Sequence, residues 1–274
     1  MRNGMEVQSK KLFISADIEG TAGIDSWEET EAGGFLYPVY AKRMTGEVNA
    51  ACEGAIAAGV GEILIKDAHN NARNIDPEGL PRCAQVVRGW IGGLCSMMGG
   101  LDESFTAVGM TGYHTACATN GNPLAHTMNL ENEAVLINGE IASEFMINAL
   151  YAATMNIPVV FVSGDAMLCE SAKALIPHIT AVPVSTGMGG AVLGMHPAEA
   201  RDKIREGMEQ ALQGDISLCK LVLPKTFEVE LRYREAKRAL HAAYYPGAAA
   251  KGMKSVTFPT DEYIEVLRFF LFNF

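Results

Sequence analysis

The sequence alternates short apolar runs with longer segments of helical spacing, and this alternation constrains the fold more than any other feature. The apolar runs predict strands over residues 11–16, 62–66, 104–110 and 158–165. Helical spacing of apolar side chains predicts helices over 40–58 and 143–155. Strands that alternate with helices are typical of an α/β fold, in which helices cover both faces of a mainly parallel sheet. We therefore expect such a central sheet.

The rest of the chain is less regular. The segment "AVLINGEIA", residues 134–142, predicts a hairpin because Asn138-Gly139 lies between apolar flanks. Residues 196–213 predict a charged amphipathic helix, 227–233 a strand, and "AAYYPGAAAKGMKS" a loop. The terminal "YIEVLRFFLFNF" is apolar enough to be a core element or an oligomer contact.

The expected organisation has three parts. Residues 1–10 form a polar extension, and residues 11–190 form an α/β domain that carries the site described below. Residues 191–274 form a smaller C-terminal subdomain that packs on the first and contributes to oligomer contacts.

Composition excludes several classes of function. The chain has 274 residues and a formal net charge of −10, without a basic cluster, which disfavours nucleic acid. No apolar run reaches the roughly 18 residues of a membrane span, and the start "MRNGMEVQSK" lacks the apolar core of a signal peptide. We expect a cytoplasmic protein. The six cysteines form no C-x-x-C pair, which favours buried thiols over a disulfide framework or a thiolate zinc site.

Polar side chains follow three of the predicted strands. Asp17 and Glu19 come after the first, Asp67 and His69 after the second, and His114 after the third. Taken singly, each is ordinarily structural: a lone histidine is usually hydrogen-bonded, and an Asp-x-Glu pair is usually a solvated turn. Parallel strands, however, bring their carboxyl ends to one edge of the sheet. A mixed set of carboxylates and imidazoles there suits a divalent ion such as zinc, and one carboxylate can bridge two ions.

These motifs resemble the D-aminopeptidases of the DppA type, zinc-dependent peptidases of the M55 family. From about residue 11 to about 185 the chain shows five of that family's motifs in the same order. They are "ADIEG", "KDAHN", "GLDESFTAVGMTGYHT", "AHTM" and "INGEIASEFMINAL". Two departures stand out. Ser143 occupies a position where the family has glycine, and the spacing from His114 to His126 is one residue longer.

The resemblance implies the site residue by residue. Two zinc ions per subunit would be held by Asp17, Glu19, His69, His114 and Glu144, with Asp17 as the bridging carboxylate. His126 matches the position with a catalytic role. The residues alone leave Glu140 and Glu144 open, because both lie near the hairpin and a carboxylate at a helix start is favoured even without metal.

The implied function is a zinc-dependent aminopeptidase. It would remove the N-terminal residue, a D-amino acid such as D-alanine, from short peptides through a metal-activated water. His126 would stabilise the oxyanion or protonate the leaving amine. The resemblance also implies a ring-like homo-oligomer, such as a decamer, enclosing the sites.

Two alternatives remain open. One is another two-metal hydrolase such as a phosphoesterase, although a phosphate substrate favours basic residues and only Lys66 and Arg73 lie near the motifs. The other is a non-catalytic metal-binding ring scaffold. Among the weaker candidates, Asp67 would orient His69, and Asp165 would support a ligand or bind the substrate amine. Two further histidines, His178 and His196, are expected to be structural or surface residues, and His241 lies in a region without a motif.

Overall fold

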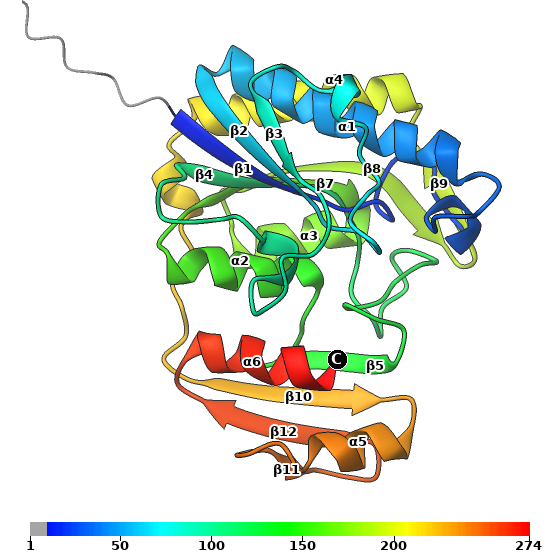
Figure 1. Ribbon diagram of the computed structural model, residues 1–274, viewed down its shortest axis with the longest axis vertical. Coiled ribbons are helices and arrows are strands. Elements are labelled where there is room, and N and C mark those ends of the chain that lie inside the picture. Colours follow the sequence, from blue (N-terminus) through cyan, green and yellow to red (C-terminus); the bar gives the residue numbers. More distant parts are fainter. Residues whose placement is uncertain (1–9) are drawn as a thin grey trace, which may run out of the picture.

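The computed structural model of the chain describes residues 10–274, which form two sheets and their covering helices (Figure 1). The predicted extension over residues 1–10 lies outside the described residues except for Lys10, which begins the first strand. The strands of the larger sheet are β1 (Lys10–Ala16), β2 (Val60–Asp67), β3 (Ala84–Val87), β4 (Ala107–Tyr113), β7 (Val159–Asp165), β8 (Thr180–Met188) and β9 (Ala191–Gly194). Those of the smaller sheet are β5 (Asn132–Ile137), β6 (Glu140–Ile141), β10 (Phe227–Tyr233), β11 (Ala249–Ala250) and β12 (Ser255–Thr260).

The larger sheet confirms the predicted mainly parallel sheet. Its strand order is β3-β2-β1-β4-β7-β8-β9, and each pair is parallel except the edge pair β8-β9. The central strand β1 is buried from Leu12 onward, as an apolar strand covered on both faces must be. Ala16 at its end pairs with Asp67 on one side and Thr111 on the other. The register therefore brings three strand ends to one edge.

Helices cover both faces of this sheet, as predicted. α1 (Tyr37–Ala57) and α4 (Pro197–Gln213) lie on one face, and α2 (Glu144–Thr154) and α3 (Ala166–Leu175) on the other (Figure 1). α1 and α4 pack closely against each other at Gly54, where a Cβ atom would lie 2.2 Å from the carbonyl oxygen of Arg205. A larger residue at this position would push the two helices apart.

The smaller sheet is antiparallel, in the order β11-β12-β10-β5-β6. It joins residues from both sides of the predicted boundary at residue 190, because β5 pairs with β10. The division at residue 190 itself stays a prediction. Two further helices belong to this part of the chain: α5 (Ala236–Ala242) and α6 (Tyr263–Asn273).

The apolar C-terminal segment is a core helix. In α6 the side chains of Val266 and Phe269 are buried, and the Tyr263 hydroxyl donates a hydrogen bond to Ile147 O of α2 at 2.7 Å. Leu271 and Phe272, at its end, stay 50% and 64% exposed. The helix thus links the two sheets and still presents an apolar surface at its C-terminal end.

Several elements differ from the sequence prediction. The third strand runs over Ala107–Tyr113 rather than 104–110, so that His114 follows it directly. The predicted loop at residues 242–255 contains β11 and the start of β12. The sequence prediction also missed α3, β3, β8, β9 and α5. In β8, Pro183 and polar residues interrupt the apolar run, and pairing with β7 outweighs this weak local preference.

Glu47 is a buried carboxyl of α1 with an incomplete set of hydrogen bonds. Its Oε1 accepts a hydrogen bond from the Ala22 backbone N–H at 2.9 Å, whereas Oε2 has no hydrogen-bond partner in the described chain. Burial raises the pKa of Glu47 from 4.5 to about 7. Because the folded chain ionises Glu47 less readily than the unfolded chain, this residue destabilises the fold increasingly as pH rises from about 4.5 to 7.

We predict that Glu47→Gln gains stability relative to the wild type as pH rises through this window, by up to about 3 kcal/mol. The measurement is the free energy of urea unfolding of both proteins at pH 5 and pH 8. Glu53→Gln, at an exposed position on the same helix, serves as the control and should show no such change. A difference between Glu47→Gln and wild type that is independent of pH would contradict the burial argument.

Candidate metal centre

The chain leaves β1 in close contact with the end of β4. Asp17 N donates to Thr111 O and Gly20 N donates to Gly112 O, both at 2.8 Å. At Gly20 a Cβ atom would lie 1.8 Å from the carbonyl oxygen of Tyr113, so only glycine fits. This approach places the side chains of Asp17 and Glu19 directly beside the residue that follows β4.

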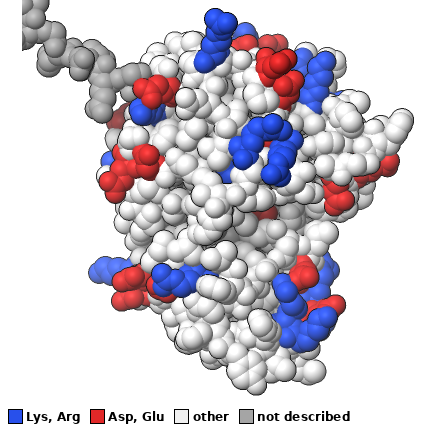
Figure 2. Space-filling view, viewed as in Figure 1, with Lys and Arg blue, Asp and Glu red and all other residues white. Residues whose placement is uncertain are grey.

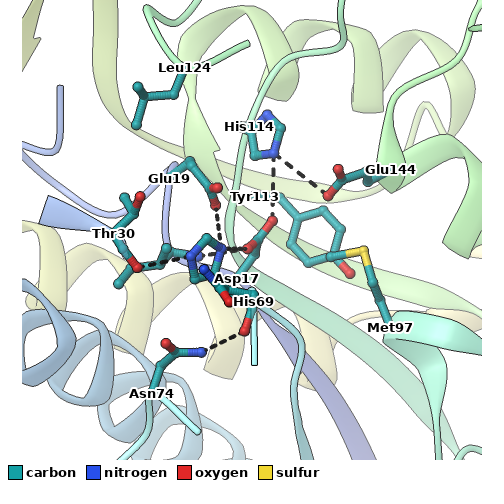
Figure 3. Close-up of polar contacts among 12 residues, drawn as sticks. Asp17, Glu19, Thr30, His69, Asn74, Met97, Tyr113, His114, Leu124 and Glu144 are labelled. Atoms are coloured by element: carbon teal, nitrogen blue, oxygen red, sulfur yellow. Dashed lines mark hydrogen bonds and ion pairs between the residues drawn. The ribbon is translucent and has the colours of Figure 1, made fainter. Parts of the chain in front are cut away.

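His69 faces both of these carboxylates. Its Nδ1 lies 3.1 Å from Glu19 Oε2 and 3.4 Å from Asp17 Oδ1. On the opposite side of the ring, Nε2 lies 3.0 Å from the carbonyl oxygen of Thr30 (Figure 3). A carbonyl oxygen can only accept, so Nε2 carries a hydrogen, and Nδ1 is the ring nitrogen that faces the carboxylates.

His114 faces the other oxygen of Asp17. Its Nε2 lies 3.7 Å from Asp17 Oδ2 and 3.6 Å from Glu144 Oε2 (Figure 3). Its Nδ1 donates to Thr115 O at 2.9 Å. Glu144 reaches this position because it is the first residue of α2. Ser143, the departure from the family glycine, is the N-cap of that helix, and its side chain accepts a hydrogen bond from Met146 N at 3.2 Å.

The predicted ligands therefore lie in two groups that share Asp17. One group is Asp17, Glu19 and His69, and the other is Asp17, His114 and Glu144. A third set of neighbouring candidate ligand atoms joins Glu19 and His114 to His126. Within each, one candidate ligand atom per residue lies within 4.8 Å of the others. Glu140, the alternative to Glu144, is exposed on β6 and lies outside both groups.

The polar atoms of these groups that lack a hydrogen-bond partner are of the types that bind zinc. Three buried atoms have no hydrogen-bond partner in the described chain: Asp17 Oδ2, Glu19 Oε2 and His114 Nε2. Buried polar atoms without partners are costly, and they occur here on three different side chains facing one another. Oxygen and imidazole nitrogen are zinc ligands, and each imidazole is fixed by a backbone carbonyl on its outer nitrogen, as metal-binding histidines are.

The pKa values of these side chains are shifted because several ionisable groups are buried close together. Burial, together with the nearby Glu19 carboxylate, raises the pKa of Asp17 well above its usual value. Burial would also raise the pKa of Glu144, but the neighbouring His114 lowers it to about 2. Burial opposes ionisation of His114, yet the surrounding carboxylates, Glu144 first, raise its pKa well above the ordinary value. The site thus attracts positive charge, which a divalent cation supplies.

His126 lies beside the two groups. Its ring stacks on the ring of His114, with centroids 4.3 Å apart, and contacts Trp27 edge-on at 5.4 Å. Its Nδ1 donates to Leu124 O at 2.9 Å, and its Nε2 lies 3.6 Å from Glu144 Oε1. The longer spacing from His114 therefore leaves His126 in contact with the centre.

A cavity of about 400 Å³ opens onto these residues. Besides the cluster, its walls include Trp27, Glu31, Asn70, Trp90, Ser96, Met128 and Leu130. No lysine or arginine side chain lines it among the described residues. An acidic cavity beside paired ligand groups is suited to a small substrate with a positively charged end.

Comparison with known proteins identifies the family of the chain. The family model described as D-aminopeptidase, peptidase family M55, matches residues 10–272. The chain belongs to peptidase family M55. It is 29% identical over 257 residues to a D-aminopeptidase of Bacillus subtilis (strain 168), and the match covers 93% of each chain.

A solved structure of an M55 peptidase has the same fold. It is the zinc-dependent D-aminopeptidase DppA from Bacillus subtilis, described as a self-compartmentalizing protease. The TM-score is 0.89 with 27% identity, over 95% of both chains. The predicted family and fold class are thereby confirmed for this M55 chain.

Two buried carboxylates support this M55 site without contacting its imidazoles. Asp67 accepts hydrogen bonds from Asn74 N (2.6 Å), Ile75 N (2.8 Å) and Asn74 Nδ2 (2.7 Å), and Asn74 Nδ2 also donates to His69 O. Asp165 accepts from Thr115 N at 2.7 Å, next to His114, and caps α3 by accepting from Leu168 N. Asp165 is buried and does not line the cavity at the metal centre, and its hydrogen bond supports the backbone next to His114.

The remaining sequence candidates lie elsewhere. His196 caps α4, His178 accepts a hydrogen bond through its backbone carbonyl from Cys219, and His241 lies in α5. The six cysteines are unpaired, four of them buried, with Cys83 exposed and Cys95 half-buried. Sequence reasoning missed Thr30 and Leu124, because backbone carbonyls leave no signal in residue type. None of the described helices combines the length and apolar character needed to cross a bilayer.

Asp67 provides a test of how the site is supported. Asp67→Ala leaves three buried N–H donors unpaired and frees the loop that carries His69. We predict a loss of about 3–5 kcal/mol in the free energy of unfolding and zinc affinity weaker by roughly 10- to 100-fold. Denaturant unfolding and zinc competition with a chelating dye measure the two effects.

The matched control is Asp102→Ala. Asp102 also accepts a backbone hydrogen bond, from Ser104 N, but it is exposed and belongs neither to the cavity lining nor to the ligand groups. It should leave zinc affinity unchanged. Equal zinc affinity in Asp67→Ala and the wild type would show that Asp67 does not position His69.

Proposed function

We propose that this chain is a zinc-dependent aminopeptidase that removes the N-terminal residue, a D-amino acid such as D-alanine, from short peptides. The observation that carries the proposal is the pair of ligand groups that share Asp17. Membership of the M55 family and the zinc dependence of the solved relative support the same activity and metal. We propose two ions per subunit, one for each of the two groups that share Asp17.

The two oxygens of Asp17 face different histidines. Oδ1 lies towards His69 and Oδ2 towards His114. We assign Asp17, Glu19 and His69 to one zinc ion, and Asp17, His114 and Glu144 to the other. Asp17 is the bridging carboxylate in this assignment. Zinc ions bound there would supply the Lewis acidity that activates water and polarises the scissile carbonyl.

His126 can exchange a proton through only one of its ring nitrogens. Its Nδ1 hydrogen is committed to Leu124 O, so only Nε2 can accept or release a proton. Nε2 lies on the side of Glu144, and the ring lines the acidic cavity. We assign to His126 the protonation of the leaving amine or the stabilisation of the oxyanion that forms on the substrate.

The cavity favours a peptide over a phosphate ester. Its charged lining residues other than histidine are all acidic, Glu31 in addition to the ligands, and acidic side chains attract the ammonium group at the N-terminus of a peptide. The two basic residues near the motifs are engaged elsewhere: Lys66 Nζ donates to Gly89 O, and Arg73 Nη1 donates to Asn71 O. The described cavity therefore offers the phosphoesterase alternative no lysine or arginine side chain for a phosphate.

The assembly belongs to the same proposal. The relative of known structure is a self-compartmentalizing protease, and we propose that this chain likewise forms a ring-like homo-oligomer, such as a decamer, enclosing its sites. The cytoplasmic location stays a prediction from the sequence. An inactive ring scaffold is the remaining alternative, and the presence of His126 beside a full ligand set disfavours it.

Zinc content and peptide cleavage test the proposal together. We predict two zinc ions per chain in the wild type, release of D-alanine from D-Ala-D-Ala, and less than one zinc ion in Asp17→Ala. The measurements are elemental analysis of the purified protein and an assay for free D-alanine. Wild-type zinc content in Asp17→Ala would contradict the assignment, and two ions without any peptide cleavage would favour the phosphoesterase or the scaffold.

Two further variants separate metal binding from proton chemistry. His126→Ala should keep both zinc ions, because neither of the two groups that share Asp17 contains His126. It should lose roughly 100- to 10,000-fold in kcat, because the proton-carrying group is removed. His241→Ala, in α5, is the control and should retain both zinc content and activity. Wild-type kcat in His126→Ala would exclude the role proposed for this histidine.

A further inference from the structure

A second cavity, of about 270 Å³, lies next to the metal centre and differs from it in character. It is formed between α2, the end of α6 and residues 90–96, and none of its lining side chains is charged. The walls that matter here are Trp90, Leu94, Met128, Tyr151, Leu267 and Leu271. On the face shown in Figure 2, charged side chains gather above and below a largely uncharged band between the two parts of the molecule.

The two cavities are neighbours with a common wall. Trp90, Ser96 and Met128 line both of them. Ser96 and Met128 are non-glycine residues with positive φ, 41° and 66°. This backbone conformation is strained for a non-glycine residue and persists only where the surrounding structure enforces it. Residues with such strain are concentrated at functional sites. Here Met128 N donates to Glu144 Oε1 at 2.6 Å, which ties the common wall to a candidate metal ligand.

Trp90 is exposed and yet held in place. Its side chain is 45% exposed, but Nε1 donates to Asn70 O at 2.7 Å. The ammonium group of Lys66 lies 4.3 Å from the centre of the ring, a cation–π distance. Lys66 is itself fully buried and donates to Gly89 O at 2.9 Å. An aromatic surface fixed in this way beside an acidic cavity is a ready contact for a ligand.

We propose that this second cavity is a specificity pocket for an apolar side chain on the substrate residue that follows the scissile bond. The inference rests on the proposed aminopeptidase function. The ammonium group and scissile carbonyl of the first residue belong with the carboxylates and the ligand groups in the acidic cavity. The chain beyond the scissile bond then continues along Trp90 and Met128 into the uncharged pocket. This enzyme accordingly prefers peptides whose second residue is large and apolar.

A series of dipeptides tests the pocket. The substrates are D-Ala-D-Ala, D-Ala-D-Leu and D-Ala-D-Phe, with the reversed pairs D-Leu-D-Ala and D-Phe-D-Ala. Moving one methylene group from water into apolar surroundings is worth roughly fourfold. We expect kcat/KM of the zinc-loaded protein to rise at least about tenfold from D-Ala-D-Ala to D-Ala-D-Leu, with no such rise for the reversed pairs.

Variants of Leu271 locate the effect in the pocket. Leu271 is half exposed, which lets α6 accept a substitution there. Leu271→Trp should narrow the pocket and bring the ratio of kcat/KM between D-Ala-D-Leu and D-Ala-D-Ala close to one. Leu271→Ala should widen it and shift the preference towards D-Ala-D-Phe. Melting temperature and zinc content show that each variant is folded and loaded.

The matched control is the next residue of the same helix. Phe272 is exposed but does not line the pocket, so Phe272→Trp should keep the wild-type ratios. Three results would overturn the proposed pocket. They are equal kcat/KM values across the wild-type series, a rise in kcat/KM confined to the reversed pairs, and the same ratios of kcat/KM in Leu271→Trp and Phe272→Trp. In each of these cases D-Ala-D-Ala is still cleaved, whereas failure of the proposed function leaves every dipeptide uncleaved.

Discussion

The structure of the site depends on the burial of Asp17 between two histidines. Its carboxyl is almost fully enclosed, Glu19 and Glu144 lie close by, and one of its oxygens has no hydrogen-bond partner in the described chain. Burying a carboxylate without a neighbouring positive charge costs roughly several kcal/mol, and neighbouring carboxylates add to that cost. Cations bound there would remove this cost and would also provide the chemistry of an aminopeptidase, so the proposal places stability and function on the same atoms.

The fold supports Asp17 through its backbone. The parallel register of β1 with β2 and β4 aligns their carboxyl ends, and Gly20 lets the chain pass directly against Tyr113. Each candidate histidine is then fixed from outside by a carbonyl, which determines the nitrogen that faces inward. The first turn of α2 adds Glu144 from a different part of the chain.

Much of the site was predictable from sequence because its chemistry is carried by side chains at strand ends. Asp17, Glu19, His69 and His114 each follow an apolar run, and parallel sheets collect such residues. Glu144 could be distinguished from Glu140 only through the family resemblance, since the turn that separates them in space has no signature in residue type. The carbonyls of Thr30 and Leu124 were not predictable, because every residue carries one.

The parts of the fold that were missed depend on distant contacts. The pairing of β5 with β10 joins residues almost a hundred positions apart, and hydrophobic periodicity reports only on local structure. Lys66 shows the same limit. From sequence it is a basic residue near the motifs, whereas in the structure it is buried beneath Trp90 and helps to shape the wall between the two cavities.

The central claim, that Asp17 bridges two metal ions, is tested most directly by anomalous diffraction at the zinc absorption edge from crystals of the zinc-loaded protein. The account predicts two peaks per chain, one beside Glu19 and His69 and the other beside His114 and Glu144, with Asp17 in contact with both. A single peak, or peaks that Asp17 does not touch, would contradict it.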